Sequence, residues 1–90
     1  MIKRYENQLT DVLETVANEG FAVVPKWKIM RWYGQSNFTI AIRRDIRERW
    51  ASIAEELEWT ETPPLRVAEC RDGRDIILMN KETFWRDDEE

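Results

Sequence analysis

The chain has 90 residues and one cysteine, contains no histidine, and carries a net charge of −4, with 42% hydrophobic and 36% charged residues. This length supports one hydrophobic core, and five tryptophans, three phenylalanines and two tyrosines are too much apolar mass for a disordered chain. The missing histidine removes the commonest general base and metal ligand, a single cysteine cannot form an internal disulfide, and no apolar run approaches the roughly 20 residues of a membrane span.

These limits predict one domain over residues 1–85, followed by an acidic tail over residues 86–90. We expect a cytoplasmic protein that has no catalytic residues, binds no metal or cofactor, and does not contact a membrane. The charged and periodic start of the chain contains no signal-peptide core. Function is therefore expected to depend on surface charge and shape.

The first predicted element is a helix from Tyr5 to Asn18, where apolar residues recur at three- and four-residue steps. Gly20 follows at the position that favours a left-handed C-cap. The apolar segment Phe21–Val24 then ends at Pro25, and the residue before a proline is pushed to extended backbone. This segment is predicted to be a short strand or an extended linker.

A short helix is predicted from Pro25 to Tyr33, because proline suits the first helical turn and Gly34 would end the helix. One buried face is expected over its two turns, formed by Trp27, Met30 and Trp32 with Ile29 and Tyr33.

The longest predicted helix runs from Gln35 to about Glu58, with Ser36 or Asn37 as its N-cap. Its apolar side chains fall on one stripe that should face the core. The stripe consists of Ile42, Ile46, Trp50, Ile53 and Leu57.

A β-hairpin is predicted from Leu65–Cys70 and Asp75–Asn80, because Asp72-Gly73 is typical of a two-residue type I′ turn. Pairing through that turn places Val67 opposite Leu78 and Ala68 opposite Ile77. After the hairpin, Lys81–Trp85 is expected to pack Phe84 and Trp85 against the core, and Cys70 is expected to be a buried structural thiol.

Charge is unevenly distributed along this acidic chain. Residues 26–49 carry seven cations and two carboxylates, a net +5, whereas residues 50–64 carry four glutamates and no cation, a net −4. The basic block favours an anionic partner, most simply nucleic acid, and four of its arginines, on the longest helix, are expected outside the core. The alternative is an arginine-rich but merely solvated helix face.

The predicted order of elements is helix, short strand, short helix, tight turn, long helix and hairpin. Over Tyr5–Asn80 this order resembles a winged helix-turn-helix domain, with Tyr33-Gly34-Gln35-Ser36 as the turn. The resemblance implies a small α+β fold, with three helices followed by a β-hairpin wing. In such domains the glycine-containing turn lets two helices meet at a steep angle, and the second helix enters the major groove of DNA.

The resemblance and the charge pattern together imply DNA contacts from the longest helix and the turn before it. Base-edge contacts are expected from the N-terminal part of this region, namely Gln35, Asn37, Ile40, Ala41 and Arg44. Phosphate contacts are expected from Arg43 and Arg47. The alternative is a solvated surface with ion pairs such as Arg44–Glu48.

Two further groups of cations are candidate DNA contacts. Phosphates flanking the groove are expected to meet the short-helix cations Lys26, Lys28 and Arg31. At the hairpin tip, Arg71 and Arg74 are expected to reach phosphates or a neighbouring minor groove, although Asp72 and Asp75 partly neutralise them. For both groups the alternative is an ordinary solvated surface.

The sequence therefore predicts a non-enzymatic, sequence-specific protein that binds double-stranded DNA, as a small transcriptional regulator or accessory factor of a phage, plasmid or other mobile element. A homodimer is expected, because one domain of this size reads few base pairs. The alternative is a protein-binding module with the same fold, which is either an adaptor or an inhibitor of a nucleic-acid-handling enzyme. The inhibitor would act through the glutamate-rich face of Glu55, Glu56, Glu58 and Glu61. The tryptophans are predicted to be core residues, with Trp59 and Trp85 as candidates for stacking on single-stranded bases.

Overall fold

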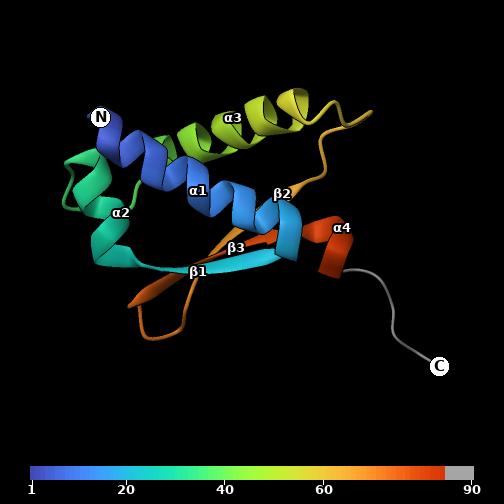
Figure 1. Cartoon of the computed structure of the whole chain (residues 1–90). Coiled ribbons are helices and arrows are strands. Elements are labelled where there is room, and N and C mark those ends of the chain that lie inside the picture. The colour runs from blue at the N-terminus through green and yellow to red at the C-terminus, as the bar shows by residue number, and fades with distance from the viewer. Residues whose placement is uncertain (85–90) are drawn as a thin grey trace.

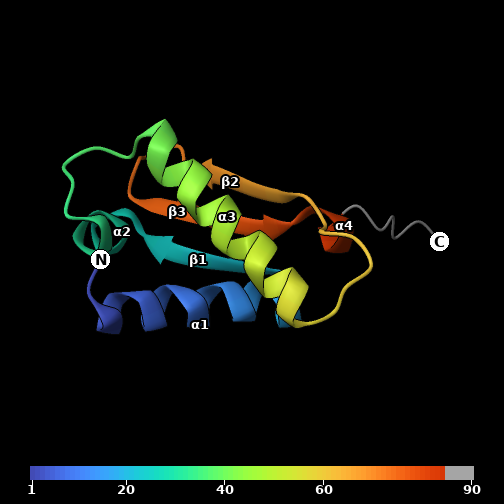
Figure 2. The ribbon, with the colours of Figure 1, turned by 90° about the horizontal axis from the view of Figure 1, so that it is seen from above.

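The computed structural model of the chain describes the backbone of residues 1–84 and the side chains of residues 1–82. The elements in chain order are α1 (Lys3–Glu19), β1 (Phe21–Pro25), α2 (Lys26–Tyr33), α3 (Ile40–Glu56), β2 (Leu65–Glu69), β3 (Asp75–Asn80) and α4 (Lys81–Phe84). Helices α1 and α3 lie over one face of the sheet, and α2 stands at the end where α3 begins (Figure 1, Figure 2). The result is a small α+β domain.

The sheet has three antiparallel strands in the order β1-β3-β2. The predicted helices and C-terminal hairpin are confirmed, but the fold is not simply three helices followed by a hairpin. Strand β1 lies between α1 and α2 in the chain and pairs with the open edge of β3, with Val23 opposite Ile77. The β-branched, extended segment before Pro25 therefore becomes a third strand of the sheet.

The predicted hairpin register is confirmed, with Val67 opposite Leu78 and Ala68 opposite Ile77. The predicted type I′ turn is wrong. Such a turn needs positive φ at both central residues, whereas only Gly73 at this tip has it, with φ 74°. The Gly73 amide donates to the Cys70 carbonyl and the Cys70 amide to the Asp75 carbonyl, both at 2.9 Å, which closes a four-residue loop.

The core lies between the helices and the inner face of the sheet. The predicted stripe on α3 is confirmed for four of its members, since Ile42, Ile46, Trp50 and Ile53 are buried. Leu57 is an exception: it is 48% exposed because α3 ends at Glu56. The partners of this stripe are buried side chains of α1, α2 and the sheet, including Leu9, Leu13, Val16, Ile29, Trp32, Ile76 and Leu78.

Helix α1 ends as predicted. Gly20 takes the left-handed conformation, with φ 100°, and its amide donates to the Val16 carbonyl at 2.9 Å. Gly34 ends α2 in the same way, with φ 64°. The glycine corner expected between the second and third helices is therefore present, but Pro25 caps α2 rather than occupying its first turn.

Helix α3 begins later than predicted. It starts at Ile40 rather than Gln35, so neither Ser36 nor Asn37 is its N-cap. Thr39 holds that position, and its hydroxyl accepts a hydrogen bond from the Ile42 amide at 3.2 Å. Phe38, which packs against the core, anchors the preceding loop and places Thr39 at the helix start.

Replacing Thr39 with alanine is expected to lower the free energy of unfolding by about 1 kcal/mol, because it removes the side-chain hydrogen bond that caps the start of α3. Urea denaturation followed by circular dichroism measures the loss. Thr39→Ser, which keeps the hydroxyl, is the matched control. Equal losses in both variants would show that the cap does not stabilise α3.

Helix α4 follows β3 directly, and the Glu82 amide donates to the Asn80 side-chain oxygen at 3.0 Å. The predicted packing of Phe84 and Trp85 and the predicted acidic tail lie outside the side chains that the structure describes. Among residues 1–84, no helix is long and apolar enough to cross a membrane.

Candidate functional site

The outer face of α3 presents two arginines to solvent. Arg44 and Arg47 are exposed, and neither makes an ion pair with another described residue, so the alternative Arg44–Glu48 pair is not formed. Ile40, near them, is 74% exposed. With Arg43, Glu48 and Ala51, these side chains line an open groove of about 570 Å³.

Charge on α3 runs against the helix dipole. Arg43 and Arg44 lie near the N-terminus, which already carries partial positive charge, and Glu55 and Glu56 lie at the C-terminus, which carries partial negative charge. Each unfavourable charge in a terminal turn costs about 0.3–1 kcal/mol. Helix stability therefore does not explain this arrangement, whereas cations beside a helix N-terminus attract anions.

Two predicted phosphate contacts are paired within the molecule. Glu69 on β2 binds Lys26 Nζ at 2.8 Å and Arg43 Nη2 at 3.6 Å. Arg43 Nη1 also donates to the Val67 carbonyl at 2.8 Å, and its guanidinium lies 4.7 Å from the centre of the Phe38 ring. A phosphate would have to compete with Glu69 for Lys26 and Arg43.

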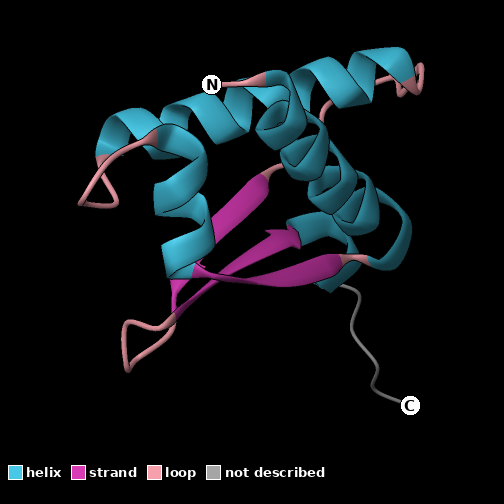
Figure 3. Cartoon of the chain, turned by 60° about the vertical axis from the view of Figure 1, so that its left-hand side comes forward, coloured by secondary structure: helices cyan, strands magenta, loops and turns pink. Residues whose placement is uncertain are grey.

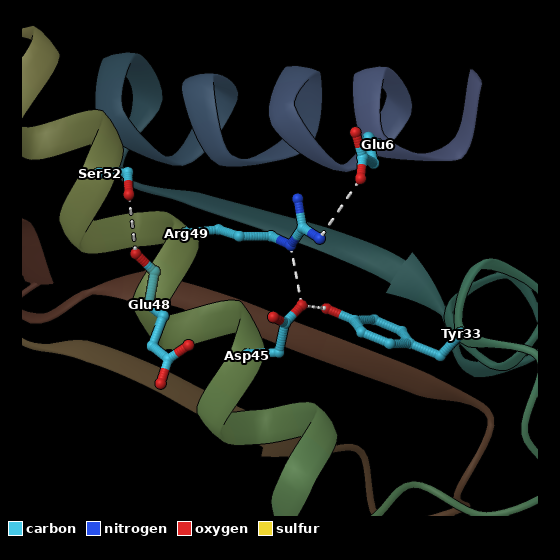
Figure 4. A network of polar contacts seen from close by, with 6 residues as sticks. All are labelled: Glu6, Tyr33, Asp45, Glu48, Arg49 and Ser52. Atoms are coloured by element: carbon cyan, nitrogen blue, oxygen red, sulfur yellow. Dashed lines mark hydrogen bonds and ion pairs between the residues drawn. The ribbon is translucent and has the colours of Figure 1, made fainter. Parts of the chain in front are cut away.

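Arg49 is held by a network that joins helices α1, α2 and α3 (Figure 4). Its Nε donates to Asp45 Oδ2 at 2.8 Å, and its Nη2 lies 3.9 Å from Glu6 Oε2 on α1. The Tyr33 hydroxyl on α2 donates to the same Asp45 oxygen at 2.6 Å. This network fixes α2 against α3 and takes Arg49 away from any external partner.

The network shifts the protonation equilibria of its members. Burial acts to raise the pKa of Asp45, but hydrogen bonds from Arg49 and Tyr33 outweigh burial, and that pKa is lowered. Burial, together with the Asp45 carboxylate, raises the pKa of the Tyr33 hydroxyl. Asp45 therefore stays ionised and Tyr33 stays a donor across the physiological range.

The remaining candidates from the sequence lie on exposed surface around the N-terminal end of α3. Gln35 and Asn37 lie in the loop before α3 rather than on the helix, and Lys28 lies on α2. At the hairpin tip, Arg71 and Arg74 are exposed, and Arg74 Nε is 3.9 Å from Asp72. The hairpin tip, the loop and α2 gather at one end of the molecule (Figure 3).

The chain matches no protein-family model, no curated protein and no solved structure.

The C-terminal end of α3 is acidic. Glu55, Glu56, Glu58 and Glu61 are exposed, and none makes an ion pair with a described residue. Glu58 and Glu61 line a depression of about 500 Å³ with Trp59 and Pro63.

Within residues 1–82, no group of three histidine, cysteine or carboxylate side chains is placed to hold a metal ion.

Two tryptophans differ from their predicted positions. Trp27, expected in the core, is 59% exposed. Trp59, expected as a stacking surface, is half-buried and packs edge-on against Trp50, with 5.7 Å between ring centres.

Cys70, expected to be buried, is only partly buried. The pKa of its thiol is raised, mainly by burial and further by the negative charges of Asp75 and Asp72. A raised pKa disfavours the reactive thiolate.

Proposed function

We propose that this domain binds double-stranded DNA and acts as a regulator by occupying its site. The observation that carries the proposal is the outer face of α3, where Arg44 and Arg47 are exposed and unpaired within the described residues. Arginine binds phosphates and the guanine edge. The exposed Ile40 adds an apolar surface suited to a thymine methyl group.

We further infer that the fold is a winged helix-turn-helix. This inference is supported by the order α1-β1-α2-α3-β2-β3, by the left-handed Gly34 that ends α2, and by the hairpin at the same end of the molecule as the start of α3. In this arrangement α3 enters the major groove and α2 crosses the backbone. Two copies are expected on DNA, because one copy of α3 reads few base pairs.

Replacing Arg44 and Arg47 with alanine is expected to weaken binding to a random-sequence DNA duplex at least tenfold. It should also lower the slope of log affinity against log salt by about two, because each arginine that meets a phosphate displaces counterions. Fluorescence anisotropy at several salt concentrations measures both quantities, and circular dichroism verifies the fold.

The matched control is Arg66→Ala, compared with the single variant Arg44→Ala. Arg66 is an exposed cation of β2 that lies opposite Met79 in the sheet, away from α3. Its loss should leave duplex affinity nearly unchanged. If the Arg44/Arg47 double variant and the parent bind duplex with the same affinity and salt slope, α3 is not a DNA-binding helix.

Protein binding through the acidic end of α3 is the second candidate function. It is favoured by Leu57, which is 48% exposed beside Glu55 and Glu56. An apolar side chain rimmed by charge is typical of a protein contact. A parent protein that fails to bind duplex at low salt would favour this second function.

A further inference from the structure

The cleft between α1 and α2 combines exposed cations with aromatic rings. Its cations are Arg4, Lys28 and Arg31, and its aromatic residues are Tyr5, Trp27 and Trp32. Gln8 completes the lining, and no described carboxylate contributes to it. The cleft has a volume of about 320 Å³, which lies within the range of small-ligand sites.

The cations of this cleft are not neutralised within the molecule. The Arg4 guanidinium lies 5.2 Å from the centre of the Tyr5 ring, and Arg31 Nε donates to the Tyr5 hydroxyl at 3.2 Å. Hydrogen bonds from these two arginines lower the pKa of Tyr5. Because none of the three cations is paired with a described carboxylate, the cleft favours an anionic ligand.

Trp27 supplies the exposed ring of the cleft. Trp32 is only 3% exposed and its Nε1 donates to Gln8 Oε1 at 2.8 Å, so its ring is part of the core. Trp27, in contrast, is 59% exposed. An exposed indole beside guanidinium groups is a surface on which a nucleic-acid base can stack.

Trp27 also borders a second depression on its other side. That depression is also lined by Lys26 of α2, by Ser36 before α3, and by Gly73, Arg74 and the carboxylate of Asp75 at the hairpin tip. The Lys26 amide donates to the Arg74 carbonyl at 2.8 Å, which holds the tip against α2. An extended ligand can therefore cross the Trp27 ring from one depression to the other, with most of the unpaired positive charge on the Arg4 side.

We propose that this cleft binds single-stranded DNA, with an unpaired base stacked on Trp27 and the adjoining phosphate held by Arg4, Lys28 and Arg31. A strand supplies a flat ring and a negative charge at every unit, which matches an aromatic platform beside cations. An acidic peptide supplies only the charge. The site goes beyond the duplex surface of α3, with which it shares no lining residue, while Lys28 and Arg31 also belong to the expected contacts for duplex phosphates.

The test measures the affinity of the full chain for labelled oligo(dT) by fluorescence anisotropy. Trp27→Ala is expected to weaken binding at least about fivefold, since stacking on one aromatic side chain contributes at that level. Trp27→Phe keeps a ring and should retain most of the affinity. Val23→Ala, which shortens an exposed apolar side chain on β1, is the matched control and should leave oligo(dT) binding unchanged.

Two further ligands separate base stacking from charge. An abasic strand of equal length keeps the phosphates, and polyglutamate keeps only the negative charge, so both should bind more weakly than oligo(dT). Equal binding of either ligand, or an unchanged affinity in Trp27→Ala, would overturn the proposal. The Arg44/Arg47 double variant should still bind oligo(dT), so loss of duplex binding and loss of strand binding are separate results.

Discussion

Replacing Trp50 with alanine is expected to lower the free energy of unfolding by about 3–5 kcal/mol. Trp50 is 1% exposed at the centre of α3, and it contacts Trp59 edge-on. Its Nε1 donates to the Pro63 carbonyl at 2.8 Å, so the substitution leaves both a cavity and an unpaired buried acceptor. A small domain has only about 5–15 kcal/mol of stability, so this variant should lie close to unfolding.

Urea denaturation followed by far-ultraviolet circular dichroism measures this loss independently of tryptophan fluorescence. Trp50→Phe keeps most of the ring and removes the donor, so a smaller loss of about 1–3 kcal/mol is expected. Trp27→Ala, at a 59% exposed position, should change stability by less than about 0.5 kcal/mol. If Trp50→Ala and Trp27→Ala have the same free energy of unfolding, the contacts of Trp50 do not stabilise the packing of α3.

Local periodicity was enough to predict the helices that line the core and the register of the hairpin. The four-residue spacing of Ile42, Ile46 and Trp50 determines which face of α3 is buried, whatever the rest of the chain does. Likewise, alternation around Gly73 determines that Val67 faces Leu78. Both features depend on residues close together in the sequence.

The connection between α2 and α3 could not be predicted in the same way. Ser36, Asn37 and Thr39 are all good N-cap residues, and the choice of Thr39 depends on Phe38 packing against a core formed by distant segments. The pairing of β1 with β3 is also distant in sequence, so the predicted hairpin lacked its third strand. Trp27 illustrates the same limit, because its apolar character indicated burial that the packing of α2 does not provide.

The sequence predicts that all four arginines of α3 lie outside the core, but it does not fully indicate which of them pair within the molecule. Of the four arginines on α3, Arg49 had a local signal for pairing, since Asp45 lies four residues before it. Arg43 had none, because its partner Glu69 is far along the chain. In the folded chain, Arg43 and Arg49 are paired with carboxylates, whereas Arg44 and Arg47 are exposed and unpaired among the described residues. The proposed DNA contact on α3 therefore centres on Arg44 and Arg47.

Replacing Asp45 with asparagine is expected to lower the free energy of unfolding at neutral pH by roughly 1–3 kcal/mol. The carboxylate accepts charge-assisted hydrogen bonds from Arg49 at 2.8 Å and Tyr33 at 2.6 Å, and the neutral amide is a weaker acceptor for both. The lower part of the range is favoured, because the Asp45 side chain is 37% exposed and solvent screens the ion pair. Glu48→Gln, an exposed position on the same helix, is the control and should have little effect.

The same substitution should change how stability depends on pH. The folded pKa of Asp45 lies below its unfolded value of about 3.9. Its stabilisation is therefore fully present above that unfolded pKa and is lost as the pH falls through the folded pKa. Glu69, whose pKa is lowered chiefly by Lys26, contributes a similar acid-dependent loss in both proteins. Urea denaturation from about pH 5 to about pH 2 should show a shallower decline for Asp45→Asn than for the parent, whereas parallel curves would mean that the Tyr33–Asp45–Arg49 network adds no stability to the folded chain.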